Sequence, residues 1–173
     1  KFKTGRRRKG WHKNCVAIGL SSGFIEPLES TSIHLIMTAI VRLLRLFPYN
    51  GVTTSAVNEY NSKLDSELNA VRDFIILHYK ATTRDDSAFW RYCRDMAVPD
   101  TLQEKLDLYQ HNGRFWRQDC ELFGEASWIA VFTGQNVFPD APHPLTEILS
   151  PEKLHDEINH IDGVLNNAVR HIP

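Results

Sequence analysis

Apolar residues recur along this chain at the spacing of helices and predict a mainly α-helical protein. From residue 29 to residue 47 the positions are apolar nearly all round. The exceptions form one narrow polar stripe: His34, Thr38, Arg42 and Arg45. A helix with so little polar surface is expected to lie buried inside a larger body. From residue 54 to residue 78, apolar residues repeat every three or four positions along one face of a second helix, and its other face is rich in Glu, Asp and Lys.

Capping residues predict shorter helices further along the chain. Ser87 follows two aspartates, and an acidic or hydroxyl side chain at this point can cap a helix that runs through Tyr92. The sequence Thr101-Leu102-Gln103-Glu104 has the capping-box pattern, so we expect it to open a helix that Gly113 closes. Another short helix is expected to begin near Glu125.

Prolines organise the last part of the chain. Those between residues 138 and 148 predict an extended connection. Ser150 then offers an N-cap, with Pro151 in the first helical position. The helix that follows, to about Arg170, is expected to bury one apolar stripe: Leu154, Ile158, Ile161, Leu165 and Val169.

The stretch before the first helix has the pattern of a strand, a turn and a helix start. The apolar run from Cys15 to Leu20 predicts a short buried strand. It breaks at Ser21-Ser22-Gly23, and the rigid pair Glu26-Pro27 then leads into the helix. Amides at a helix N-terminus lack partners within the helix and have a partial positive charge, so they can hold an anion. The pattern is equally typical of an ordinary structural connection.

Composition and charge argue against several classes of protein. The net charge of −1, from 20 basic and 21 acidic residues, provides no field that would attract nucleic acid or an anionic membrane. No segment is apolar enough to suggest a membrane span. Cys15, Cys93 and Cys120 form no C-x-x-C pair, so we expect free thiols in a reducing, cytoplasmic compartment. The histidines form no ligand pattern with acids or cysteines, so no metal site is expected.

One segment resembles a known family. The sequence from Trp11 to Met37, WHKNCVAIGLSSGFIEPLESTSIHLIM, is similar to the flavin-dependent tryptophan halogenases. Residues 21–31 match that family's SS-x-F-x-EPLEST signature letter by letter. Arg72-Asp73-Phe74 and the run from Phe89 to Lys105 also resemble its helical half, and the similarity thins after about Asn136.

The resemblance implies a place in a larger fold. The chain would be the C-terminal helical part of an α/β FAD-binding fold, Rossmann-like and of the flavin monooxygenase superfamily, with one terminal strand of the FAD domain near its N-terminus. We expect residues 1–30 to end the FAD-binding domain and residues 31–173 to form a helical substrate-side domain. The glycine-rich dinucleotide fingerprint, the W-x-W-x-I-P motif and the tunnel lysine of the family are absent here. We therefore expect a C-terminal portion of an enzyme that is inactive by itself.

The resemblance also implies an activity. In this family, FADH2 supplied by a separate flavin reductase reacts with oxygen to give a flavin hydroperoxide, which oxidises chloride or bromide to hypohalous acid. The oxidant passes through a tunnel and halogenates an electron-rich ring, usually an indole. Members that act on free tryptophan have an aromatic, asparagine-rich segment that residues 113–128 do not match. We therefore expect an indole or another small aromatic substrate in preference to free tryptophan.

Glu29 is the catalytic residue that the resemblance implies. Considered without the family, a glutamate in the first turn of a helix is usually a partner of the helix dipole. The family signature instead implies that Glu29 orients the aromatic substrate and accepts its proton, or stabilises the cationic intermediate. The neighbouring Ser30 and Phe24 would also face the substrate, although the core is the better-supported place for Phe24. Glu26, which precedes a proline, is expected to make a structural hydrogen bond.

The halide and the flavin are expected on the other side of the same helix start. The resemblance implies that the backbone amides of Thr31 and Ser32 bind the halide. Many members have Thr-Gly at this point, and a backbone amide survives the change to serine. The residues expected along the edge of the isoalloxazine are small or rigid: Gly19, Ser21, Ser22, Gly23 and Pro27.

Two alternatives remain open at the level of sequence. A flavin monooxygenase of the same superfamily would hydroxylate its substrate without halide. A non-catalytic helical module would use the same helices to bind a partner.

Overall fold

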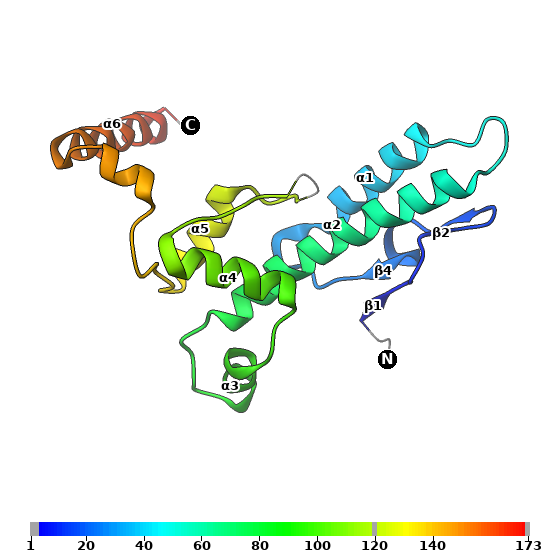
Figure 1. Ribbon diagram of the computed structural model, residues 1–173, viewed down its shortest axis with the longest axis horizontal. Helices are drawn as coiled ribbons and strands as arrows, with labels where there is room; N and C mark the ends of the chain where they lie inside the picture. Colours follow the sequence, from blue (N-terminus) through cyan, green and yellow to red (C-terminus); the bar gives the residue numbers. More distant parts are fainter. Residues whose placement is uncertain (1–3, 119–120, 172–173) are drawn as a thin grey trace. The chain divides into compact units, whose positions relative to one another are not determined.

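The structure, a computed structural model, describes residues 4–118 and 121–171, and helices dominate it (Figure 1). The helices are α1 (Ser32–Arg45), α2 (Thr54–Lys80), α3 (Ala88–Asp95), α4 (Asp100–Asn112), α5 (Glu125–Gly134) and α6 (Pro151–Arg170). The strands are β1 (Gly5–Arg6), β2 (Trp11–His12), β3 (Cys15–Val16) and β4 (Gly23–Phe24). Short 3-10 turns are η1 (Gly19–Ser21), η2 (Leu28–Ser30) and η3 (Pro144–Ile148). The helices that the sequence predicts are thus all present.

The chain divides into two compact units. Residues 1–105 and 116–137 form the first unit, and residues 106–115 and 138–173 form the second. The division at residue 30 between an FAD-binding and a substrate-side domain stays a prediction.

The strands are short and antiparallel. β1 pairs with β4, with Gly5 opposite Phe24, and β2 pairs with β3 in a hairpin, with Trp11 opposite Val16. The predicted buried strand over residues 15–20 is therefore wrong in length and in burial. Cys15 is exposed, and the positive φ of +64° at Gly19 turns the chain into η1. A hairpin partner of two residues cannot support a longer ladder.

The core of the first unit forms where the β2–β3 hairpin packs on α2. The buried residues Trp11, Tyr60, Leu64 and Leu68 make one cluster, in which the Trp11 and Tyr60 rings meet edge to face at 5.6 Å. The Asn61 side chain on α2 makes two hydrogen bonds to the backbone of the hairpin. Its side-chain oxygen accepts from the Trp11 amide, and its side-chain nitrogen donates to the Trp11 carbonyl, each at 2.9 Å.

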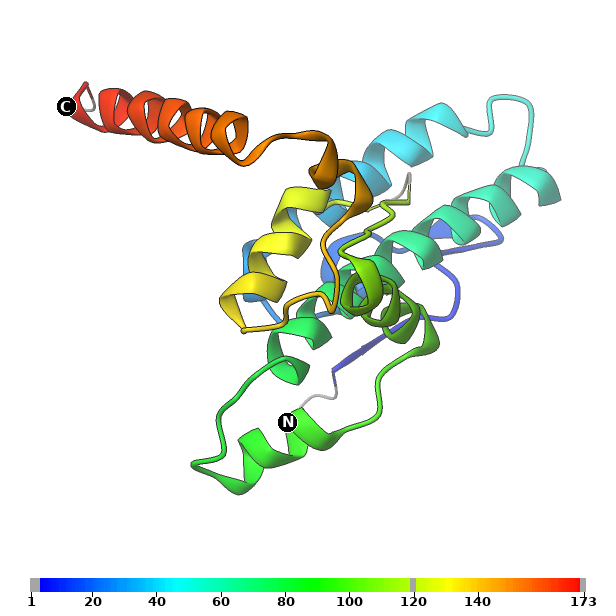
Figure 2. The same cartoon turned by 60° about the vertical axis from the view of Figure 1, so that its left-hand side comes forward.

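α1 lies antiparallel beside α2, as both views show (Figures 1 and 2). The face that α1 turns toward α2 is not the one that the sequence predicts. Two residues of its polar stripe face Glu67 on α2: Arg42 donates to it at 2.8 Å, and His34 Nε2 lies 3.6 Å from it. Ala39 is buried on this side of α1, and Leu35 and Leu43 pack against the core. Many of its other apolar residues are exposed, including Ile33 at 72% and Leu44 at 62%. The prediction that solvent wets only the polar stripe is thus wrong for this chain, because a buried acid on α2 attracts that stripe. The exposed apolar side is the surface that a larger body would cover.

Aromatic side chains connect the C-terminal half of α2 to α5. Phe74 is 1% exposed and stacks on Phe123 with ring centroids 3.9 Å apart. The Trp128 ring meets the same phenylalanine at 4.9 Å. This cluster holds the last turns of α2, which matter for the site described below.

Local capping follows the predictions with one exception. The Ser87 and Ser150 side chains accept from the amides of Trp90 and Lys153 and begin α3 and α6. Thr101 does not cap α4, because that helix begins one residue earlier and the Thr101 hydroxyl donates to Asp73. A tertiary partner here displaces the capping box.

The second unit contains α6 and the connection that leads to it. Its connecting segment is not extended throughout, because residues 144–148 form η3 after His143. Every described residue of α6 is exposed, so the predicted burial of its apolar stripe is wrong for this chain. Of the helices that the structure describes, not one is long and apolar enough to cross a membrane.

Candidate active site

The signature segment adopts an unusual backbone conformation immediately before α1. Pro27, with φ −76°, leads into η2, in which Glu29 has φ +64° and ψ +7°. Ser30 follows with φ +53°. Residues other than glycine in this left-handed region cost of order 1–3 kcal/mol each, and such residues cluster at functional sites. The strain in two consecutive residues therefore marks Glu29 and Ser30 as a candidate site.

The backbone turn brings the Glu29 carboxylate to α2. Its Oε1 atom lies 3.4 Å from Nε2 of His78, and the side chains of Glu29 and His78 are 43% and 19% exposed. The other ring nitrogen, Nδ1, is 2.8 Å from the Phe74 carbonyl. Glu29 thus has one side against α2 and one side open to an incoming molecule. Ser30 is exposed beside it.

Glu26 is the anchor of the segment. The Tyr79 hydroxyl, on α2 next to His78, donates to Glu26 Oε1. This confirms the structural hydrogen bond expected of Glu26. The bond stabilises the neutral phenol, and together with burial it raises the pKa of Tyr79 to about 12. Because the pKa in the folded state exceeds the ordinary value, the bond stabilises the fold fully below about pH 10. That stability is lost as the pH rises toward about 12.

Tyr79→Phe tests this anchor. We expect the absorbance change assigned to Tyr79, taken as wild type minus variant in a pH titration, to appear near pH 12. A free tyrosine would titrate near pH 10, at about the value of an unperturbed phenol. Tyr49→Phe is the matched control, because the Tyr49 side chain is 84% exposed. If the Tyr79 change appears at the same pH as the Tyr49 change, the anchor is not formed.

The start of α1 presents amides in the place expected for a halide site. The Leu35 amide donates to the Thr31 carbonyl at 3.0 Å and makes the first hydrogen bond of the helix. The amides of Ser32, Ile33 and His34 precede it and have no carbonyl partner within the helix. Thr31 is 2% exposed, and its Oγ1 atom has no hydrogen-bond partner among the described residues. Ser32 is exposed. Halide binding by Thr31 and Ser32 stays a prediction.

The turn before the signature segment is bonded within itself. The Ser21 hydroxyl donates to the Ile18 carbonyl at 2.8 Å, and the Ser22 hydroxyl donates to the Gly19 carbonyl at 2.7 Å. These hydroxyls are therefore occupied by the turn. A Cβ on Gly19 would lie 3.2 Å from Ile36, and one on Gly23 would lie 2.8 Å from the Arg6 backbone, so both positions require close approach.

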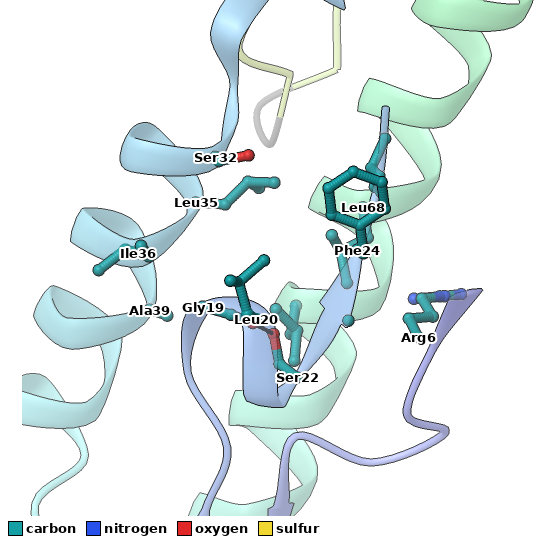
Figure 3. Close-up of a pocket in the computed structure, with 13 residues that line it drawn as sticks. Arg6, Gly19, Leu20, Ser22, Phe24, Ser32, Leu35, Ile36, Ala39 and Leu68 are labelled. Carbon is teal, nitrogen blue, oxygen red and sulfur yellow. Dashed lines mark hydrogen bonds between the residues drawn. The ribbon is translucent and has the colours of Figure 1, made fainter. Parts of the chain in front are cut away.

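A small pocket lies between this turn, α1 and α2 (Figure 3). Its volume is about 60 Å³, and Figure 3 shows Ser32 and Leu35 pointing into it from α1. Gly19, Ser22, Gly23 and Phe24 also line it. Pockets for ligands of drug size measure roughly 300–1,000 Å³, so this space alone does not hold a flavin. Leu20, Ser21 and Pro27 are exposed beside it, and contact of this turn with a flavin stays a prediction.

His78 is the site residue that the sequence did not predict. It stands 49 positions after Glu29, on another helix, and no local motif links the two. The sequence does predict a helix that reaches residue 78, but nothing in it indicates that this helix packs next to Glu29. Among the described residues, no group of three or more His, Cys, Asp or Glu side chains could hold a metal ion.

Comparison with known proteins identifies the family. Residues 1–151 match the family model for tryptophan halogenase. RebH, a tryptophan 7-halogenase from Lentzea aerocolonigenes, is 28% identical over 187 residues, which cover 99% of this chain and 35% of that protein. BrvH, a flavin-dependent halogenase from Brevundimonas sp. BAL3, has a TM-score of 0.93 and 45% identity over 99% of this chain and 35% of its own. Xcc4156, a flavin-dependent halogenase from Xanthomonas campestris, has a TM-score of 0.92 and 43% identity over 97% of this chain and 34% of its own.

This chain therefore spans about a third of the length of these relatives. The comparisons confirm both the predicted family and the predicted fold class, a mainly helical part of a larger flavoprotein fold. Since the family model matches most of its residues, the chain belongs to the tryptophan halogenase family.

Proposed function

We propose that this chain is part of an FADH2-dependent halogenase that oxidises chloride or bromide and halogenates an electron-rich aromatic ring. The observation that supports it best is the strained placement of Glu29 directly before the start of α1, where the first helical hydrogen bond is the one from Leu35 to Thr31. Amides at this position could bind the halide that is to be oxidised. The carboxylate next to them could accept the proton that the aromatic ring loses.

The proposed halide site and the proposed substrate site lie on different sides of the start of α1. Ser32 lines the pocket beside the Gly/Ser turn, whereas the Glu29 side chain meets α2 at His78. In this proposal the amides of Thr31 and Ser32 hold the halide. Gly19, Ser21, Ser22, Gly23 and Pro27 approach the isoalloxazine edge. The reduced flavin, when bound, supplies with oxygen the oxidising equivalents that convert halide to hypohalous acid.

On the substrate side, the Glu29 carboxylate orients the ring and accepts the proton that halogenation displaces. A carboxylate also stabilises the cationic ring before the proton leaves. Ser30 is exposed at the same turn and is proposed to contact the substrate, together with Phe24. We propose an indole or a related scaffold as the substrate, because residues 113–128 lack the segment that grips free tryptophan in similar enzymes.

The proposal includes partners beyond this chain. The rest of the enzyme, with the FAD domain, would cover the exposed apolar side of α1. A separate flavin reductase would supply FADH2. A cytoplasmic location is supported by the free thiols of Cys15 and Cys93. Cys120, the third predicted thiol, lies outside the described residues.

The test uses the complete enzyme with a flavin reductase, NADH, FAD, oxygen, bromide or chloride, and indole or tryptophan. We expect mass spectrometry to detect a halogenated product whose mass follows the halide supplied. A hydroxylated product that forms without halide would contradict the proposal and favour a flavin monooxygenase.

Ser32→Asp tests the halide site separately. A carboxylate in the first turn of α1 is expected to stabilise the helix by about 0.3–1 kcal/mol. The same charge repels an anion at the adjacent amides, so we expect the KM for halide to rise about tenfold or more, within the range of about 1–4 kcal/mol for charges roughly 4 Å apart. Ser32→Asn, of equal size and without charge, is the matched control.

In Ser32→Asp the thermal stability should rise while the apparent affinity for halide falls, as measured by thermal unfolding and by the halide dependence of the rate. An unchanged halide KM in a stabilised variant would place the halide elsewhere.

A further inference from the structure

The orientation of His78 is fixed by two contacts within its own helix. Nδ1 lies 2.8 Å from the Phe74 carbonyl, and because a carbonyl only accepts, Nδ1 carries a proton. The imidazole also meets the Phe74 ring edge to face, with centroids 4.8 Å apart. Phe74 itself is buried against Phe123. The ring therefore has one defined position and one defined neutral tautomer, with Nε2 unprotonated.

That free nitrogen faces Glu29. Nε2 lies 3.4 Å from Oε1 of the carboxylate. Both atoms are acceptors when Glu29 is a carboxylate, so a proton that Glu29 takes up lies between Oε1 and Nε2 and can pass from one to the other. The proton is then on His78, as an imidazolium beside a carboxylate, or on Glu29, as a carboxylic acid beside a neutral imidazole.

The other ionisable groups close to this pair have partners of their own. Tyr79 donates to Glu26, and Lys80 donates to the Met96 carbonyl at 2.8 Å. Asp73, one position before Phe74, accepts from Arg72 at 2.6 Å and from the Thr101 hydroxyl. Among the described contacts, Glu29 is therefore the ionisable partner of the His78 Nε2 atom.

We propose that His78 is a positioning residue for Glu29 and the acceptor of its proton, an inference that rests on the proposed halogenation. The C–H bond at the halogenated carbon breaks, its electron pair returns to the ring, and the proton goes to the Glu29 carboxylate. Glu29 passes this proton to Nε2, which restores the carboxylate. The resulting imidazolium donates to both Glu29 and Phe74. Its extra proton leaves to solvent, which reaches the 19% exposed side chain.

His78→Gln separates proton transfer from position in the complete enzyme. The glutamine amide can donate a hydrogen bond to Glu29, but it cannot take up a proton. We expect kcat for halogenation to fall about tenfold, less than the roughly 10²–10⁴-fold typical of losing the general base itself. The KM values for halide and for the aromatic substrate should stay the same. Formation of hypohalous acid, measured with a small-molecule trap, should also be unchanged.

Chemical rescue gives a readout that a structural role would not. In His78→Ala, added imidazole should restore kcat in proportion to its unprotonated fraction, so the rescued rate should follow the pH of the buffer. His12→Gln is the control, because His12 is an exposed histidine on β2, outside the segment and helices that form the site. It should keep the wild-type kcat and pH profile.

A measurement without turnover checks the tautomer. Nitrogen chemical shifts of ¹⁵N-histidine in the resting enzyme at high pH should show His78 protonated at Nδ1 and bare at Nε2. The opposite tautomer would overturn the inference.

The outcomes distinguish the two proposals. Absence of a halogenated product from the wild type would refute the proposed function. A halogenating wild type whose His78→Gln variant retains kcat and pH profile, with no imidazole rescue of His78→Ala, would refute the role of His78 alone.

Discussion

Glu29→Gln in the complete enzyme is expected to lower kcat for halogenation by about 10²–10⁴-fold, the usual contribution of a positioned general base. The amide has the same shape as the carboxylate but can neither accept a ring proton nor balance a cationic ring. Production of hypohalous acid should continue, because the amides of α1 are separate from this side chain. The rates of halogenated product and of trapped oxidant, measured side by side, check the prediction.

Glu26→Gln is the matched control for this variant. It lies in the same motif, and its amide oxygen can still accept from the Tyr79 hydroxyl, so we expect near wild-type rates. Glu29→Gly provides a second comparison. Glycine adopts the φ of +64° without strain, so the variant should remain at least as stable while losing activity. Equal rates in Glu29→Gln and wild type would show that Glu29 is not the base.

Arg42→Met is expected to cost about 3–5 kcal/mol of unfolding free energy, the usual effect of leaving one member of a buried ion pair without its partner. Glu67 on α2 is 5% exposed and accepts from Arg42 at 2.8 Å. The guanidinium also lies over the Tyr60 ring, at 5.6 Å from its centroid. This interaction draws the polar stripe of α1 toward α2, so its loss should loosen the helix pair that holds the signature segment. Denaturant titration measures the change.

The double variant Arg42→Met with Glu67→Leu is the control. Apolar replacement of a whole buried pair is often neutral or stabilising, by about 1–4 kcal/mol, so most of the lost stability should return. Arg45→Met, on the same helix with an exposed side chain, should change stability by less than about 0.5 kcal/mol. If the double variant is no more stable than Arg42→Met, the pair does not orient α1.

The candidate site was predictable as far as it is local. Residues 26–32 contain the proline, the acids and the helix start, and the expected structural bond of Glu26 is present. The left-handed backbone at Glu29 and Ser30 was not predictable, because neither residue type favours it. The partner of Glu29 was missed for another reason. His78 reaches it only after α1 and α2 pack antiparallel, and a separation of 49 positions leaves no local pattern.

The sequence by itself determined the helices, most of their caps and the family, because periodicity, capping residues and the EPLEST motif are properties of neighbouring positions. Tertiary structure alone decided which residues of α1 pack on α2, that the described residues of α6 stay exposed, how short the strands are and which side chain meets Glu29. Periodicity shows that a helix has an apolar side but not what covers it. In α1 the buried acid Glu67 draws Arg42 of the polar stripe inward, so much of the apolar surface that the sequence pattern assigned to a core remains open for the rest of the enzyme.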